Sequence, residues 1–260
     1  MSLRLATAVV SDLGLIRSNN EDAAFTGQRL LAVADGIGGA PAGEVASEIV
    51  IGALRTLDDA PDNGDAEEAL RSALADANRQ IAEAAEADPA RQGMGTTVTA
   101  LLVTGDRLAL LHVGDSRGYL LRAGGLVRLT RDDTFVQELV DRGLLSVEDA
   151  RDHPQRSIIT QSVQGGEFTA TVNLLDPQTG DRYLLCSDGL SDYVTDGSIE
   201  QALALCPEPQ LCAEHLVRLA LRAGAPDNVT VVVCDVVLAS PDGHSPPQPL
   251  GSTAARTSTP

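Results

Sequence analysis

The sequence predicts an α+β domain in which two antiparallel sheets pack together and are flanked by helices. The predicted strands come in adjacent runs rather than alternating singly with helices, which disfavours a parallel βαβ fold. Two amphipathic helical stretches separate the first strands from a meander of four short strands. With 260 residues, the chain can bury a core of this kind without disulfides or a structural metal.

The first part of the chain is predicted to form two strands and then two helices. Apolar residues fill 6–11 and 30–34, and each run ends in a turn signal, Ser-Asp-Leu-Gly or Asp-Gly-Ile-Gly-Gly. Apolar side chains then recur at helical spacing over 43–57 and 66–87, on either side of a polar break at 58–65.

The middle of the chain combines short strands with short helices. Strands separated by glycine-containing turns are expected at 96–103, 107–113, 118–122 and 126–129. Short helices are expected at 134–142 and 146–152, followed by an irregular polar segment at 153–166. Part of 134–166 is expected to form a mobile flap that shapes access for a protein substrate.

The last part of the chain is predicted to complete one domain. A strand at 182–187 is followed by helices at 198–205 and 209–222 and by a fully apolar strand at 228–237, as expected for a buried position. The composition then changes to Ser, Pro, Gly and Thr. We therefore expect one domain over 1–238 and a disordered tail over 239–260.

The composition excludes several classes of function. The chain has 19 Lys+Arg against 37 Asp+Glu, a net charge of −18, and only 2% aromatic residues. Such a chain repels phosphate backbones and anionic membranes and lacks rings for base stacking, so we expect no nucleic-acid or membrane partner. It also contains no Lys, which excludes standard P-loop NTPases, protein kinases and Schiff-base enzymes.

The cysteines and histidines offer no metal-binding or redox pattern. The four cysteines form no C-x-x-C pair, and we expect them to be reduced. His112, His153 and His215 are isolated, which is typical of packing or surface residues. No signal peptide is visible over 1–10 and no apolar run approaches membrane-spanning length, so we expect a soluble, cytoplasmic protein.

Acidic residues recur where the buried strands begin or end. Asp35, Asp115 and Asp188 follow apolar runs, and Asp227 precedes the last strand. Each of them alone could be a turn residue. Strand ends of one sandwich share a rim, however, so these carboxylates can converge and would then repel one another unless cations neutralise them. Ligands that offer only oxygen suit Mg²⁺ or Mn²⁺.

Six short motifs occur in order along the chain. They are Gly14-Leu15-Ile16-Arg17 with Asn20-Glu21-Asp22, Asp35-Gly36-Ile37-Gly38-Gly39, Gly95-Thr96-Thr97, Val113-Gly114-Asp115-Ser116-Arg117, Ser187-Asp188-Gly189 and Asp227-Asn228-Val229-Thr230. With these motifs the sequence resembles the bacterial type 2C metal-dependent protein Ser/Thr phosphatases, the PPM family. The resemblance covers residues 4–238.

The resemblance implies a four-layer α/β/β/α sandwich that binds two Mg²⁺ or Mn²⁺ ions tightly and a third more weakly. Asp35 would bridge the two tight ions, and the Gly36 carbonyl would bind the second. Glu21 would serve the second ion directly or through water, with Asp22 behind it.

The remaining motif residues complete the implied site. Asp188 and Asp227 would complete the coordination of the first ion, and Asp115 together with Asp188 would hold the third ion. Arg17 would clamp the substrate phosphate, a role that its planar guanidinium suits.

Two positions depart from the family pattern. Ile37 stands where animal members commonly carry a His proposed as the acid for the leaving group, which leaves the proton donor open. The family's usual Asp-His-Ser after the meander is here Asp132-Asp133-Thr134, which leaves the role of this segment open.

Four rival interpretations have weaker support. Ser116 lies in a G-x-S-x-G match, but that motif needs a helix after the Ser, where a strand is predicted. Cys212 and Arg218 match C-x5-R, but a helix would separate their side chains by about 120°. Pro41 stands in place of the third glycine of a dinucleotide loop. A catalytically dead phosphoprotein-binding module would have lost a metal carboxylate, and every motif carboxylate is present.

The sequence therefore predicts a metal-dependent hydrolase that removes phosphate from phosphoserine and phosphothreonine in proteins. A metal-bridged hydroxide would attack the phosphorus without a phosphoenzyme intermediate. The expected partners are phosphorylated proteins and a bacterial Ser/Thr kinase pathway that the enzyme would reverse in signalling. We expect a monomer.

Overall fold

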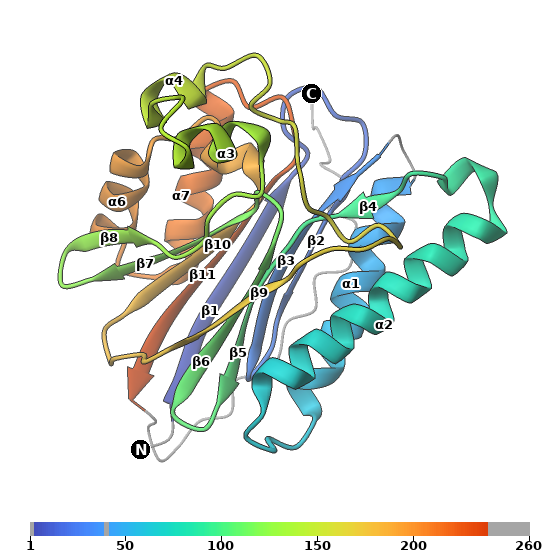
Figure 1. Cartoon of the computed structure of the whole chain (residues 1–260). Coiled ribbons are helices and arrows are strands. Elements are labelled where there is room, and N and C mark those ends of the chain that lie inside the picture. The colour runs from blue at the N-terminus through green and yellow to red at the C-terminus, as the bar shows by residue number, and fades with distance from the viewer. Residues whose placement is uncertain (1–2, 39–41, 239–260) are drawn as a thin grey trace, which may run out of the picture.

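The computed structural model of the chain describes residues 3–38 and 42–238. Figure 1 shows two stacked sheets with helices on both outer faces. This arrangement confirms the predicted four-layer sandwich. The tail predicted over 239–260 lies outside the described residues.

The first sheet has the antiparallel strand order β1-β11-β10-β7-β8. Its strands are β1 (Leu3–Asp12), β7 (Arg117–Arg122), β8 (Gly125–Arg128), β10 (Arg182–Cys186) and β11 (Val229–Leu238). Its outer face packs against the helices α5 (Asp188–Ser191), α6 (Asp196–Leu205) and α7 (Pro209–Arg222).

The second sheet has the antiparallel order β2-β3-β5-β6-β9, with β4 paired to β3. Its strands are β2 (Asp22–Thr26), β3 (Leu30–Ile37), β4 (Gly95–Thr96), β5 (Val98–Thr104), β6 (Arg107–Val113) and β9 (Thr171–Leu175). Its outer face packs against α1 (Ala42–Asp59) and α2 (Ala66–Ala87), and a short 3₁₀ turn, Pro89–Arg91, follows α2.

The core has three layers because side chains alternate along each strand. On β3, Leu31 and Val33 lie in the apolar cluster between the sheets, whereas Ala32 and Ala34 belong to the cluster under α1 and α2. On β11, Val232 faces the opposite sheet. Central strands of both sheets are therefore buried on two sides, which explains their nearly continuous apolar sequences.

The chain also forms elements that the sequence pattern did not predict. The strands β2 and β9 are short, and both β9 and the first half of β2 are partly exposed, so neither shows a clear apolar alternation. The helix α5 has only four residues and directly follows β10. The other predicted strands and helices are present with small shifts of their ends.

Two short helices lie above one end of the sandwich. They are α3 (Phe135–Asp141) and α4 (Val147–Arg151), at the top of Figure 1. All four cysteines are unpaired. Among the helices of the described residues, none combines the length and apolar character needed to cross a bilayer.

Candidate metal centre

The predicted site residues lie at the end of the sandwich where α3 and α4 lie. Because neighbouring strands are antiparallel, the ends of β1, β3, β6 and β10 share this rim with the starts of β2, β7 and β11. We call it the acidic rim. It carries the carboxylates of Glu21, Asp22, Asp35, Asp115, Asp188 and Asp227.

Asp35 is held by hydroxyl groups from the Gly95-Thr96-Thr97 segment. Its carbonyl accepts hydrogen bonds from the Thr96 hydroxyl (2.8 Å) and the Thr97 amide (2.9 Å), and its amide donates to the Thr97 hydroxyl (3.2 Å). Asp22 is the cross-strand partner of Asp35 in the β2–β3 ladder. The backbones of both residues are therefore fixed at the same end of one strand pair.

Gly36 allows the backbone of β3 to approach α1. A Cβ at this position would lie 2.6 Å from the Glu21 carbonyl oxygen and even closer to the Gly43 carbonyl. The same Glu21 carbonyl accepts hydrogen bonds from the Gly36 amide (3.1 Å) and the Ser47 hydroxyl (2.7 Å). A glycine is thus required here for a steric reason, and the contact places Glu21 beside Asp35.

Asp115 follows a turn that is anchored from two sides. Gly114 has φ +103°, a conformation that favours glycine, and a Cβ there would meet the Thr97 side chain. The Gly114 amide donates to the Asp133 carboxylate (2.9 Å), and the Asp133 amide donates back to the Gly114 carbonyl (2.7 Å). These bonds orient Asp115 toward the rim, and only 8% of its surface is exposed.

The first sheet contributes Asp188 and Asp227. The Ser187 hydroxyl, just before Asp188, donates to Asp22 (2.8 Å) and accepts a hydrogen bond from the Thr230 amide (2.9 Å). One hydroxyl therefore connects β10, β11 and the start of β2, so that the carboxylates of the two sheets share one site.

The electrostatics of the rim are those of crowded anions. Burial and the carboxylates of Asp22, Asp188, Asp115 and Asp227 raise the pKa of Asp35 well above its usual value. The pKa of Asp188 is raised in the same way. Burial raises the pKa of Asp115 to about 7 and that of Asp22 to about 6. A cation at the rim would remove this repulsion.

The donor set fits divalent ions. Oδ1 of Asp22 and Oδ1 of Asp115 are buried and have no hydrogen-bond partner within the described residues, although buried polar atoms are normally paired. All the acidic donors offer oxygen, as Mg²⁺ and Mn²⁺ prefer. Over residues 3–38 and 42–238, no three His, Cys, Asp or Glu side chains lie close enough together to hold a metal ion by themselves. An ion at the rim would therefore keep waters among its ligands, as Mg²⁺ usually does.

Arg17 lies at the exposed edge of the acidic rim. Its Nη2 donates to Oδ2 of Asp227 (2.7 Å), and its Nη1 lies 3.7 Å from Oε2 of Glu21. The hydrogen bond to Asp227 raises the pKa of the guanidinium. The predicted phosphate clamp therefore also touches two predicted metal carboxylates, a contact that the sequence does not reveal.

The role of Asn228 at the site is not evident from the sequence alone. The Asn228 side chain is buried, accepts a hydrogen bond from the Glu21 amide (2.8 Å), and donates to the carbonyls of Leu13 (3.1 Å) and Asn19 (3.0 Å). It thereby fastens the loop that carries Arg17 to the start of β11. Its position beside Asp227 in the motif was the available signal.

The open role of Asp132-Asp133-Thr134 is now defined. Asp132 accepts hydrogen bonds from Nε and Nη2 of Arg117, at 3.0 and 2.6 Å. Asp133 fixes Gly114, as described above, and the Thr134 hydroxyl caps the N-terminus of α3. The segment fastens the base of α3 and α4 to the turn that carries Asp115.

The structure gives no support to the rival catalytic motifs. Ser116 is fully buried, and its hydroxyl bonds to the Thr97 hydroxyl (2.7 Å) rather than to a base. Cys212 lies on the buried side of α7 with a pKa raised to about 12 by burial, whereas Arg218 is exposed and pairs with Glu214. The β3 strand is antiparallel to its neighbours, unlike the strand of a dinucleotide-binding unit.

Comparisons with known proteins agree with this geometry. Residues 17–216 match the family model described as Protein phosphatase 2C. The serine/threonine protein phosphatase PstP of Mycobacterium tuberculosis is 54% identical over 237 residues, which are 91% of this chain and 46% of PstP. The chain thus spans about half the length of this relative. The serine/threonine phosphatase stp of Listeria welshimeri is 36% identical, covering 86% of this chain and 93% of stp.

Solved structures show the same fold. The crystal structure of the M. tuberculosis serine/threonine phosphatase PstP/Ppp has a TM-score of 0.88 and 53% identity, and covers 90% of this chain and 100% of that one. A crystal structure of the PstP catalytic domain in complex with two manganese ions has a TM-score of 0.86 and 52% identity, with 91% and 100% covered.

Proposed function

The chain belongs to the protein phosphatase 2C family, and we propose that it hydrolyses phosphoserine and phosphothreonine in proteins with the help of divalent metal ions. The observation that carries the proposal is the convergence at one rim of five aspartates from both sheets, four of which raise the pKa of the fifth, Asp35. We propose residues 1–238 as the catalytic domain.

The metal ligands of the proposed site come from both sheets. Asp35 would be shared between two ions, with the Gly36 carbonyl on one of them and Asp188 and Asp227 on the other. Glu21, directly or through water, would serve the ion bound by the Gly36 carbonyl, with Asp22 behind it. Asp115 would hold a third, weaker ion together with Asp188. The PstP structure with two manganese ions supports the choice of Mn²⁺ or Mg²⁺.

Bound divalent ions would lower the pKa of water toward neutrality and offset charge on the phosphate. Residues of the chain itself orient the groups that would bind the ions and the phosphate. The hydroxyls of Thr96 and Thr97 hold Asp35 in place, and Asn228 holds the Arg17 loop. Arg17 would place two N–H groups on the phosphate oxygens. Ile37 carries no transferable proton, so we assign protonation of the leaving oxygen to a water molecule.

We further propose that phosphorylated proteins are the substrates, that the enzyme opposes a Ser/Thr kinase, and that it acts as a monomer. The relatives described as serine/threonine phosphatases support the first of these statements.

Hydrolysis of a phosphothreonine peptide tests the proposed function. Release of phosphate should depend on added Mn²⁺ and stop when EDTA is present in excess. A phosphotyrosine peptide of the same sequence serves as a control for residue class. Activity that survives chelation would contradict the metal-dependent reaction.

A further inference from the structure

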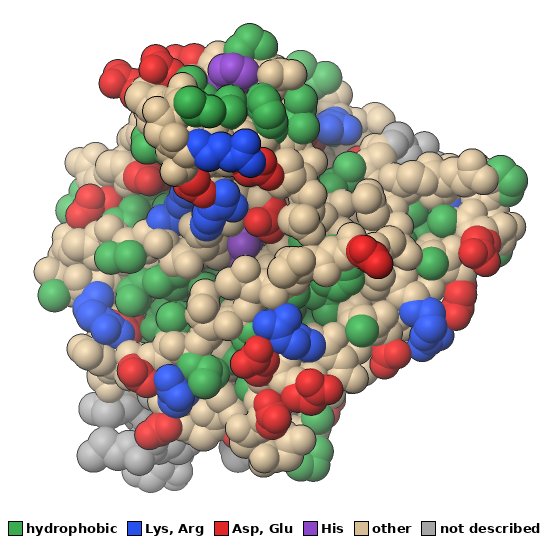
Figure 2. Space-filling model, viewed as in Figure 1, with side chains coloured by type: hydrophobic (Ala, Val, Ile, Leu, Met, Phe, Trp, Pro, Cys, Tyr) green, Lys and Arg blue, Asp and Glu red, His purple; other side chains and the backbone are tan. Residues whose placement is uncertain are grey.

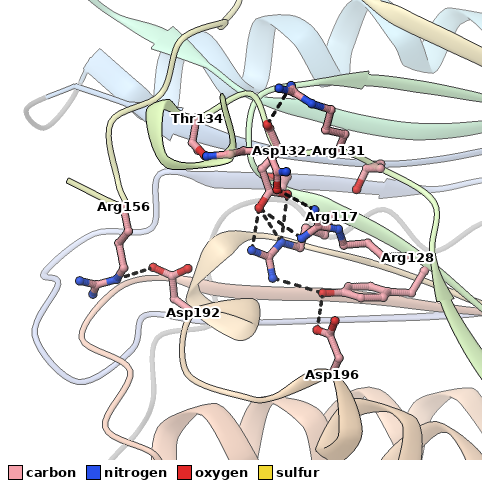
Figure 3. A network of polar contacts seen from close by, with 12 residues as sticks. Arg117, Arg128, Arg131, Asp132, Thr134, Arg156, Asp192 and Asp196 are labelled. Atoms are coloured by element: carbon pink, nitrogen blue, oxygen red, sulfur yellow. Dashed lines mark hydrogen bonds and ion pairs between the residues drawn. The ribbon is translucent and has the colours of Figure 1, made fainter. Parts of the chain in front are cut away.

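A cavity of about 250 Å³ lies beside the acidic rim, between α3 and α4 on one side and the first sheet with α5 on the other. Asp115 and Asp188 are among its lining residues, so it adjoins the proposed catalytic site. Figure 3 shows part of its wall, where the charged side chains of several elements meet. The proposed reaction places a third, weaker ion at Asp115 and Asp188 and makes no use of the rest of the space.

The wall of the cavity is rich in arginine for this chain. Arg117, Arg128, Arg151 and Arg156 line it, although the whole chain has only 19 basic residues against 37 acidic ones. Apart from the two rim aspartates, the acidic residues of the wall are Asp132, Asp192 and Asp196. With ions bound at Asp115 and Asp188, four cations would face the three remaining anions of the wall. Figure 2 shows Arg side chains gathered below the α3–α4 segment.

The acidic groups of the wall already have partners. Asp132 accepts hydrogen bonds from two nitrogens of Arg117 and also lies 3.5 Å from Arg128 (Figure 3). Asp192 lies 3.4 Å from Arg156, and Asp196 accepts a hydrogen bond from the Tyr119 hydroxyl (3.1 Å). Arginines therefore match the charges of Asp132 and Asp192, whereas Asp196 is paired with a neutral hydroxyl.

Two donors of the wall are left without a partner. The Arg151 guanidinium, at the end of α4, is exposed and forms no hydrogen bond or ion pair within the described residues. The Ser191 hydroxyl is 97% buried, lines the same cavity, and also has no partner among them. Val136, Val140 and Val147 supply an apolar side. The cavity can therefore receive an anion on a short aliphatic stem.

We propose that this cavity is a subsite for a second anionic group of the substrate, a carboxylate or a phosphate close to the phosphorylated Ser or Thr. The proposal rests on the proposed phosphatase function. An extended peptide advances about 3.3 Å per residue, so an anion two or three residues from the reacting phosphate would reach the arginines. The net charge of −18 repels acidic peptides in general. A preference for them would therefore identify a local basic site.

Three phosphothreonine peptides of otherwise equal sequence test the subsite. One has neutral flanks, one carries Glu at the second and third positions on both sides, and one carries phosphoserine at these positions, which distinguishes a carboxylate from a phosphate. The measured quantity is the ratio of kcat/KM for an anionic peptide to that for the neutral peptide. The enzymes are the wild type, Arg151→Gln, Arg151→Lys and Arg79→Gln. Arg79 lies on α2, is exposed and lies outside the cavity lining, so its variant matches the charge change.

The subsite predicts a ratio of about ten for the wild type, the size of one charge-assisted hydrogen bond. The ratio should fall below about three in Arg151→Gln, stay between these values in Arg151→Lys, and be unchanged in Arg79→Gln. A wild-type ratio near one, or an equal fall in Arg79→Gln, would overturn the subsite while leaving the phosphatase function intact. If Mn²⁺ supports hydrolysis of none of the three peptides, the phosphatase function fails and the subsite with it.

Discussion

The orientation of single side chains at the acidic rim depends on hydrogen bonds from other elements. The hydroxyls of Thr96 and Thr97 hold the backbone of Asp35, and the Ser187 hydroxyl holds the carboxylate of Asp22. Sequence motifs identify the carboxylates, because their types and spacing are visible in one dimension. They do not identify Asn228 or Ser187 as holding residues, because an amide or hydroxyl gains that role only through partners distant in the chain.

The Arg17→Ala substitution tests the phosphate clamp. KM for a phosphothreonine peptide should rise about tenfold if the guanidinium binds ground state and transition state alike. Because Arg17 also neutralises Asp227, its removal leaves the rim more negative, and Mn²⁺ affinity should be maintained or increase. Steady-state kinetics and calorimetric Mn²⁺ titration measure the two effects. Lost Mn²⁺ binding with an unaltered KM would show instead that Arg17 supports the metal carboxylates.

The Ser116→Ala substitution separates the proposed reaction from a serine hydrolase. The Ser116 hydroxyl is buried against Thr97, so its removal should cost about 1 kcal/mol of unfolding free energy while most of kcat is kept. Urea denaturation and peptide hydrolysis measure these quantities. A fall in kcat of about a hundredfold in a folded protein would restore Ser116 as a nucleophile.

At the scale of secondary structure, apolar patterns predicted the long elements and several short ones but missed β2, β9 and α5. The helices α1 and α2 and the strand β11 are long enough to show their period. The strand β2, Asp-Ala-Ala-Phe-Thr, is held by pairing with β3, and α5 is a single turn between β10 and the rest of its layer. Such elements are fixed by tertiary packing rather than by local propensity.

The packing of β3 against α1 can be tested with two glycines. In Gly36→Ala the new Cβ would overlap the carbonyls of Glu21 and Gly43, and about 1–3 kcal/mol of unfolding free energy should be lost. Gly52→Ala is the matched control, because Gly52 lies within α1 and a Cβ there meets no atom within 4 Å. This variant should gain roughly 0.5–1 kcal/mol. Equal effects of the two changes in urea denaturation would refute the close-approach explanation.

At the scale of the whole molecule, the two sheets bring distant segments to one edge. Glu21 and Asp227 are near opposite ends of the described chain. The Asn228 side chain nevertheless accepts a hydrogen bond from the Glu21 amide, and the Asn228 backbone amide donates to the Asp227 carboxylate. The shared rim was predictable from the alternation of strands and turns. The cavity beside the rim was not, because it depends on how α3 and α4 pack against β7, β8 and α5.

The crowding of carboxylates predicts a pH-dependent gain of stability on metal binding. Without ions, the pKa values of Asp22 and Asp115 are raised to about 6 and about 7, above the value of about 3.9 in an unfolded chain. The folded state therefore holds these protons more tightly, and the metal-free protein loses this stability as the pH rises through 6 to 7.

The increase of Tm from excess EDTA to saturating Mn²⁺ measures this coupling. It should be at least about 4 °C larger near pH 8 than near pH 5.5. Taking the difference at each pH cancels groups outside the rim, such as His112, whose pKa is lowered by burial. An increase that is larger at the lower pH would contradict the assignment of the acidic rim as the metal centre.

The Asp35→Asn substitution, measured by Mn²⁺ calorimetry and peptide hydrolysis on the same sample, tests the metal-centre assignment most directly. The change keeps the shape of the side chain but removes the anion proposed to serve both ions. The wild type should bind two Mn²⁺ tightly. In folded Asp35→Asn protein, tight binding should be lost and kcat should fall at least about 100-fold, roughly 2.7 kcal/mol of activation free energy. Unchanged Mn²⁺ binding with near-normal turnover would show that Asp35 is only a turn residue and that the reaction takes place elsewhere.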